Sequence, residues 1–105
     1  MCHWNIAYTL SEVQRLALLA KKCGMDGVVC SGREIDAVRK LCGKDFIVLT
    51  PGIRTAENAN AQDQKRIMTP AAAAKKSSDY IVVGRSIIKA KNPLVVAKKI
   101  LQDIK

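Results

Sequence analysis

Residues 46–54 read FIVLTPGIR, and this stretch decides the fold class. Its first four residues form an apolar run bounded by turn residues, which predicts a short buried β-strand. Thr50, Pro51 and Gly52 end the strand and open a loop that carries Arg54. In a parallel α/β protein, ligands bind beyond the carboxyl ends of the strands. The loop that begins at Thr50 is therefore the first place to look for function.

Two more segments have the same strand pattern, GVVC at 27–30 and YIVV at 80–83. Like 46–49, each is too short for a helix and contains β-branched residues, which favour buried strands. Segment 5–8 is a weaker candidate for a fourth strand, because asparagine and alanine are poor strand formers. The sequence therefore predicts about three strands.

Helices are predicted before, between and after these strands. Thr9 with Glu12, and Ser31 with Glu34, have the spacing of a capping box, which marks a helix start. Thr69 precedes a proline, and this pair is typical of an N-cap followed by the first helical position. Glycines close the first two helices. With their caps, the predicted helices cover residues 9–24, 31–43, 69–77 and 92–104.

The predicted order of elements is αβαβαβα, an alternation that requires a parallel sheet with right-handed crossovers. No low-complexity linker interrupts it, so residues 1–105 are interpreted as a single α/β unit. The segment from Thr50 to about Gln64 is long and aperiodic. Long loops in compact domains are usually functional or disordered, and we expect this one to be functional.

Composition limits the class of protein. Hydrophobic residues make up 49% of the 105 residues, which argues against disorder. No run approaches the roughly 18 apolar residues of a membrane span, and the first residues lack the features of a signal peptide. We therefore expect a cytoplasmic protein with no membrane association.

The cysteines give no indication of a metal site. Cys2, Cys23, Cys30 and Cys42 include no C-x-x-C pair, and the single His3 cannot complete a zinc site of the usual spacing. A disulfide framework would require a secreted context that nothing else in the sequence indicates. We expect free, mostly buried thiols and no metal.

The formal net charge of +9 raises the alternative of a nucleic-acid-binding module, because lysine and arginine neutralise phosphates. The basic residues are scattered, however, and 4% aromatic residues leave little for base stacking. We therefore expect most of the charge to lie on solvated faces and keep nucleic-acid binding as the weaker alternative.

Loops after the predicted strands carry residues suited to a phosphate. Gly84 lets a ligand approach the backbone, and Arg85 can grip a phosphate through two hydrogen bonds. Arg54 and Gln64 bracket the long loop, where a glutamine can donate to a phosphate oxygen or to a base carbonyl. Ser31 follows the first strand, where it can cap a helix and also reach a ligand. Taken singly, each residue also fits a structural role.

Four longer motifs contain these residues: DGVVCS at 26–31, TPGIR at 50–54, DQKRIMTP at 63–70 and SDYIVVGR at 78–85. Together they resemble the carboxyl-terminal half of orotidine 5'-phosphate decarboxylase of the bacterial type. The motifs stand in the order of the family with near-correct spacing, and the resemblance extends over about residues 10–105. The loop between Arg54 and Gln64 differs from the family in length and lacks its usual glycine.

The resemblance implies a fold, a reaction and a set of contacts. The family fold is a (β/α)8 barrel, so the chain would be a partial TIM barrel with about three parallel strands and four helices. The family acts in pyrimidine biosynthesis, where it removes carbon dioxide from orotidine monophosphate to give uridine monophosphate without a metal or organic cofactor. Ser31 is implied to meet the pyrimidine, and the loop carrying Pro51 is implied to close over it. The implied phosphate contacts are Arg54, Gln64, Gly84 and Arg85.

The catalytic signature of that family, D-x-K-x-x-D, does not occur in these 105 residues. Asp63 and Lys65 begin such a pattern, but Met68 stands in the place of the second acid. We therefore expect no catalytic residue in this chain and no activity for the chain alone.

A half barrel would have two bare strand edges and an interior face turned toward water, whereas parallel sheets are normally buried on both faces. We therefore expect a homo-oligomer or a pairing with a complementary amino-terminal half. Two further interpretations stay open. One is a truncated, non-catalytic remnant that self-associates or binds anions, and the other is a different phosphate-binding barrel enzyme that shares this half.

Overall fold

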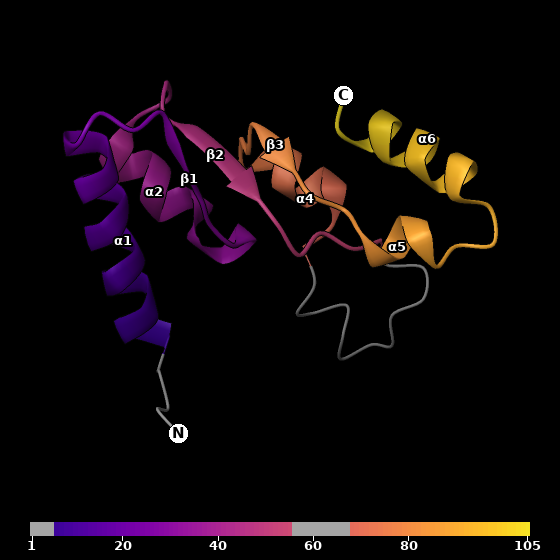
Figure 1. The fold of residues 1–105 in the computed structure, drawn as a ribbon, viewed down its shortest axis with the longest axis horizontal. Coiled ribbons are helices and arrows are strands. Elements are labelled where there is room, and N and C mark those ends of the chain that lie inside the picture. Colours follow the sequence, from indigo (N-terminus) through magenta and orange to yellow (C-terminus); the bar gives the residue numbers. More distant parts are fainter. Residues whose placement is uncertain (1–5, 56–67) are drawn as a thin grey trace.

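The computed structural model describes residues 6–55 and 68–105. Helices and strands alternate through the described residues, as the sequence predicts (Figure 1). In chain order the elements are α1 (Ile6–Lys22), β1 (Gly27–Val29), the 3-10 helix η1 (Gly32–Glu34), α2 (Ile35–Cys42), β2 (Ile47–Thr50), α4 (Pro70–Lys75), β3 (Tyr80–Ile81), α5 (Arg85–Ile88) and α6 (Pro93–Asp103). The described part thus has five α-helices, one more than expected, because the short α5 follows Gly84.

The three strands form one parallel sheet in the order β1-β2-β3. Val28 pairs with Val48, and Thr50 pairs with Ile81, so β2 is the central strand. Figure 1 shows α1 and α2 at the β1 end of the sheet, and α4, α5 and α6 toward the β3 end. The parallel sheet predicted from the alternation of elements is confirmed.

The core lies between the sheet and the first two helices. Val48, Ile35 and Val38 are fully buried there, and Val13 of α1 packs against the same cluster. Thr50 is a buried polar residue, and its hydroxyl forms a 2.7 Å hydrogen bond with the Ser78 hydroxyl. This bond satisfies the hydroxyl without water at the point where β2 ends.

Local sequence features correctly predicted where α1 and α2 end and where α4 and α6 begin. Gly24 and Gly43 both have φ of +88° just after α1 and α2, a conformation that glycine adopts without a steric penalty. At the start of α4, the Thr69 hydroxyl accepts a hydrogen bond from the Ala72 N–H at 3.2 Å. At the start of α6, Asn92 accepts in the same way from Val95 at 3.3 Å. These end signals are confirmed.

The start of α1 differs from the expectation. The helix begins by Ile6, so Thr9 lies inside it instead of capping it. Residues 6–8 are helical, so the candidate fourth strand at 5–8 is wrong for these three residues. Residue 5 lies outside the described residues. Neither glycine nor proline separates 6–8 from the periodic run that follows, so nothing in the sequence stops the helix from extending backward.

The strands also shift slightly from the predicted ranges. β1 is one residue shorter than 27–30, β2 covers 47–50 in place of 46–49, and β3 is reduced to Tyr80–Ile81. The Val82 N–H still donates to the Thr50 carbonyl at 3.0 Å, so pairing continues one bond beyond β3. Such differences are within the usual uncertainty of element boundaries.

Candidate functional site

The candidate site lies at the edge of the sheet where all three strands end. Because the strands are parallel, the loops after β1, β2 and β3 leave the sheet on the same side. Ser31, Pro51 and Arg54 are exposed residues of the first two loops. Gly84 and Arg85 are exposed after β3, and Gln64 lies outside the described residues.

Met68 connects the first two loops. Ile53 is only 2% exposed and forms an isolated parallel bridge with Met68, and the Arg54 N–H donates to the Met68 carbonyl at 3.1 Å. The Met68 side chain also packs over Gly32, where an added Cβ would lie 2.3 Å from the methionine methyl. The glycine therefore lets the loop that carries Ser31 lie close to the chain beside Arg54.

Ser86 connects the loop after β2 to the loop after β3. Its hydroxyl accepts a hydrogen bond from the Thr55 N–H at 3.1 Å. Arg54 directly precedes Thr55 and Arg85 directly precedes Ser86 in the chain. The bond therefore brings the two arginine-bearing loops side by side. Neither arginine forms an ion pair with another described residue.

The backbone beside these arginines is open to a ligand. Gly84 is exposed, and nothing lies within 4 Å of the position that a Cβ would occupy. Arg85 begins α5 directly after this glycine. Of the six residues expected to bind, the structure therefore brings the loops of Ser31, Arg54 and Gly84–Arg85 together at one edge. Pro51 lies in the same loop as Arg54, two residues before the buried Ile53.

Ser31 also has the structural role that the sequence indicated. Its N–H donates to the Glu34 carboxylate at 2.9 Å, and the Glu34 N–H donates to the Ser31 carbonyl at 3.0 Å. These bonds fix the turn that enters η1, so Ser31 is the N-cap of this short helix.

Cys30 directly precedes Ser31 in the chain, but its thiol is not a nucleophile. Burial raises the pKa of its thiol to about 11, with the nearby Glu34 carboxylate adding to the rise and Arg39 opposing it. A thiol with this pKa stays protonated at neutral pH, and the thiolate is the reactive form. Cys30 and Cys42 are buried free cysteines, as expected, whereas Cys23 is free but exposed.

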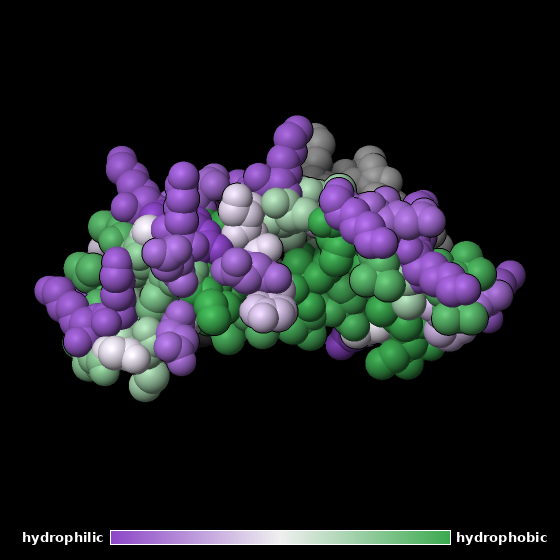
Figure 2. Space-filling view, turned by 90° about the horizontal axis from the view of Figure 1, so that it is seen from above, coloured by the Kyte–Doolittle hydropathy of each residue, from purple (hydrophilic) through white to green (hydrophobic). Residues whose placement is uncertain are grey.

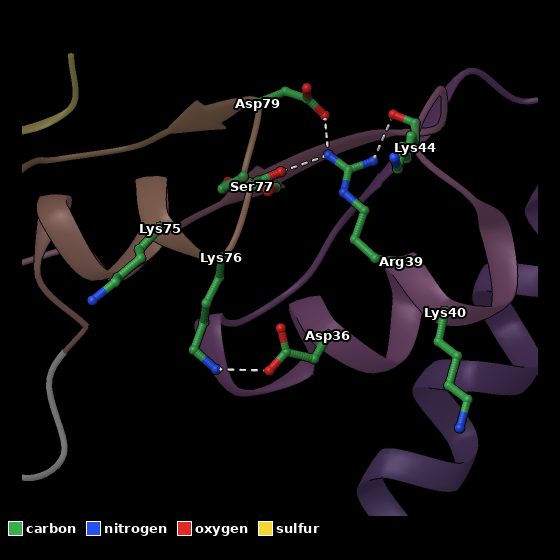
Figure 3. Close-up of a pocket in the computed structure, with 9 residues that line it drawn as sticks. Asp36, Arg39, Lys40, Lys44, Lys75, Lys76, Ser77 and Asp79 are labelled. Carbon is green, nitrogen blue, oxygen red and sulfur yellow. Dashed lines mark hydrogen bonds and ion pairs between the residues drawn. The ribbon is translucent and has the colours of Figure 1, made fainter.

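A basic hollow of about 670 Å³ lies at the opposite edge, where β2 and β3 begin (Figure 3). Arg39 of α2 is its central side chain and donates to the Phe46 carbonyl, to the Ser77 carbonyl at 2.6 Å and to the Asp79 carboxylate at 2.6 Å. Asp79 also accepts from the Val48 N–H at 2.8 Å. No local sequence pattern indicates this cluster, because its members are up to 40 residues apart in the chain.

The side chains around this hollow bind backbone groups and one another, so they stabilise the fold. The hydrogen bond from the Val48 N–H is the main cause of a lowered pKa at Asp79, Arg39 lowers it further, and partial burial opposes them. Lys76 pairs with Asp36 at 3.0 Å, while Lys40 and Lys75 point away from Arg39 (Figure 3). In TIM barrels the edge where strands begin serves stability and the opposite edge serves function. The hollow is therefore not the candidate site.

The described residues give no sign of a metal centre or a membrane span. Within 6–55 and 68–105, no group of three or more His, Cys, Asp or Glu side chains is arranged to hold a metal ion. No helix of that part is both long and apolar enough to cross a membrane.

Comparison with known proteins identifies the family. Residues 4–100 match the family model described as Orotidine 5'-phosphate decarboxylase / HUMPS family. The chain belongs to this family. Among curated members, an orotidine 5'-phosphate decarboxylase of a Geobacter species is 53% identical over 92 residues, which are 88% of this chain and 38% of that protein. The decarboxylase of Actinobacillus pleuropneumoniae is 50% identical over 99 residues, which are 94% of this chain and 43% of that protein.

Solved decarboxylase structures confirm the fold. The crystal structure of orotidine 5'-phosphate decarboxylase from Lactobacillus acidophilus has a TM-score of 0.77 at 34% identity over 99% of this chain and 40% of that chain. The enzyme from Pyrococcus horikoshii has a TM-score of 0.68 at 29% identity over 90% of this chain and 42% of that one. The sheet is thus part of a TIM barrel, and the chain spans about two fifths of the length of these decarboxylases.

Proposed function

We propose that this chain is the phosphate-binding part of an orotidine 5'-phosphate decarboxylase. In this proposal Arg54, Gln64, Gly84 and Arg85 surround the phosphate of orotidine or uridine monophosphate. Ser31 meets the pyrimidine, and the loop with Pro51 covers it. Residues 1–105 then act as one carboxyl-terminal half-barrel unit.

The observation that carries the proposal is the hydrogen bond between Thr55 and Ser86, which joins the two arginine-bearing loops. Two guanidinium groups in adjacent loops suit a phosphate dianion, because each can donate two parallel hydrogen bonds to its oxygens. The open backbone at Gly84 lets the phosphate approach the first amides of α5.

Met68 is the first described residue after Gln64 in the chain. Met68, four residues later, is anchored to Arg54 by a backbone hydrogen bond and packs over Gly32. These contacts hold Met68, which lies just before α4, at the same edge of the sheet as the two arginines. Gln64 itself lies outside the described residues, and in the proposal its amide donates to a phosphate oxygen without adding charge.

The reacting groups must come from elsewhere in the assembly. Decarboxylation breaks a carbon–carbon bond and leaves an electron pair on the pyrimidine ring, which then takes a proton. The family signature places that proton on the lysine of D-x-K-x-x-D, and this signature is absent from the 105 residues. A complementary amino-terminal half or another copy of a barrel segment is therefore part of the proposed active assembly.

Release of carbon dioxide from orotidine monophosphate tests the proposal. The chain is mixed with the part of the Geobacter relative that lies outside the match, and each component is also assayed alone. We expect release only from the mixture, with a KM raised about 100-fold by Arg85→Ala, because a charged hydrogen-bond donor to phosphate is lost.

Lys40→Ala is the matched control, since this exposed cation lies at the opposite edge of the sheet. It should leave KM unchanged. The proposal is wrong if Arg85→Ala and Lys40→Ala give the same KM in an active mixture.

A second candidate is a non-catalytic protein that binds phosphate-bearing anions. The missing signature favours it, because the phosphate loops remain while the acid and lysine residues do not. It predicts binding of uridine monophosphate without any release of carbon dioxide from the mixture.

A further inference from the structure

The basic hollow where β2 and β3 begin is not the proposed substrate site, yet its charges are unbalanced. Its lining contains five cations and two carboxylates, which leaves a net charge of +3. The cations are Arg39, Lys40, Lys44, Lys75 and Lys76, and the carboxylates are Asp36 and Asp79. Charges of one sign around a concave surface raise the local potential and concentrate ions of the opposite sign there. The hollow is therefore suited to an anion.

Both carboxylates of the lining already have partners. Asp79 accepts from the Arg39 guanidinium at 2.6 Å and from the Val48 N–H at 2.8 Å. Asp36 pairs with Lys76 at 3.0 Å. Neither carboxylate is therefore left to neutralise the remaining lysines of the hollow.

Two helices, α2 and α4, end beside the hollow, and the carbonyl oxygens of a helix end normally disfavour an anion. Arg39 offsets this effect at the end of α2, since it donates to the Gly43 carbonyl at 3.3 Å and to the Lys44 carbonyl at 3.2 Å. At the end of α4, a partial charge of about −0.5 is outweighed by the full charges of Lys75 and Lys76. The local potential therefore stays positive.

Lysine side chains line the hollow from two sides. Lys44 lies in the connection from α2 to β2 and Lys75 in the last turn of α4. Both are exposed, and neither forms an ion pair with another described residue. Lys75 points away from Arg39 in Figure 3, but the flexible four-carbon stem of a lysine lets its ammonium group turn toward a ligand. Lys76 can join them, because its surface pair with an exposed carboxylate contributes little.

The size and lining of the hollow favour a small ligand over a nucleic acid. Its volume of about 670 Å³ lies within the roughly 300–1,000 Å³ of small-molecule sites. The lining residues include no aromatic side chain on which a base could stack. Figure 2 looks down on the top of the molecule in Figure 1, where β2 and β3 begin, and shows hydrophilic side chains standing out from that face.

We propose that this hollow binds a small anion of two or three linked phosphate groups, held by Lys44 on one side and by Lys75 and Lys76 on the other. Linked phosphates carry several negative charges along a short chain, so one ligand can meet cations from both sides at once. A single phosphate group reaches one side only and binds more weakly. The site lies at the edge opposite Arg54 and Arg85, so it does not depend on the proposed function.

Titration calorimetry of the full chain with sodium tripolyphosphate tests this site. We expect binding that Lys44→Ala and Lys75→Ala each weaken about tenfold, because each variant removes one charged donor. Inorganic phosphate should bind at least about tenfold more weakly than tripolyphosphate. Tripolyphosphate should also shift the backbone amide NMR signals of Ser77 and Ser78, which line the hollow. This last measurement uses only the wild-type chain.

Lys98→Ala is the matched control, since this exposed lysine of α6 lies outside the lining and its loss changes the net charge by the same amount. It should leave the affinity unchanged, as should Arg85→Ala, and far-UV circular dichroism should be the same for all variants. Equal weakening by Lys98→Ala would show attraction to the overall charge, and a loss confined to Arg85→Ala would place the anion at the other edge. Either result, or no binding, would overturn the proposal. So would a short single-stranded RNA that binds more tightly than tripolyphosphate and depends on Lys44, because the occupant would then be a nucleic acid.

Discussion

Arg39 connects three separate parts of the chain through hydrogen bonds to carbonyl and carboxylate oxygens. It lies on α2 and binds the segments that lead into β2 and β3. Its side chain is 15% exposed, so the charge is held in a partly dehydrated setting where unpaired groups are costly. The Arg39–Asp79 pair therefore fixes the edge of the sheet opposite the candidate site.

Asp79→Asn tests this pair through its pH dependence. The Val48 N–H and Arg39 hold the pKa of Asp79 below its ordinary value of 3.8, so the folded state favours the carboxylate. The resulting stability is fully present above the unfolded pKa and is lost as pH falls through the folded one. We expect wild type to have the higher Tm at pH 7, and the difference from Asp79→Asn to shrink below about pH 4.

Thermal unfolding followed by circular dichroism between pH 3 and pH 7 measures this difference. Asp36→Asn is the control, because the Asp36 side chain is 73% exposed and its pair with Lys76 should contribute little. A gap between wild type and Asp79→Asn that stays constant down to pH 3 would show that the charge of Asp79 does not contribute.

At the scale of elements, the features that sequence reasoning predicted are local ones. A threonine before a proline predicted the start of α4, and three apolar runs predicted three strands, because caps and strands depend on residues close together in the chain. The candidate loops followed from the strand ends. The bonds that join those loops, from Met68 to Arg54 and from Thr55 to Ser86, connect distant segments and have no local signal.

The early start of α1 has a different cause. Thr9 has the residue type and spacing of a cap, yet no glycine or proline at residues 6–8 stops the helix before it. The helix therefore extends back to Ile6, and Thr9 lies inside it. Gln64 and the rest of 56–67 lie outside the described residues, so the expectation for that contact stays a prediction.

Thr69→Ala tests the most local of these features. The Thr69 hydroxyl accepts from the Ala72 N–H, and its loss should lower the free energy of unfolding by about 1 kcal/mol. Thr69→Ser keeps the accepting oxygen and should retain most of that stability. Urea unfolding of the three proteins gives the comparison, and equal losses for serine and alanine would argue against the cap.

At the scale of the whole molecule, the chain is an open arc of a barrel. Its Cα radius of gyration is 14.9 Å, against about 13 Å for a compact domain of this length. The sequence indicated a bare inner face through the family resemblance, since alternation alone does not reveal how many strands a sheet contains. The loops after all three strands nevertheless meet at one edge of this open sheet.

Binding of uridine monophosphate and of uridine to the reconstituted complex, measured by titration calorimetry, tests the phosphate cradle most directly. The two ligands differ only in the phosphate, so we predict that uridine binds at least about 100-fold more weakly. Arg85→Ala should remove most of this difference, and Lys40→Ala should preserve it. Equal affinities for the two ligands, or an undiminished preference for the nucleotide in Arg85→Ala, would contradict the account.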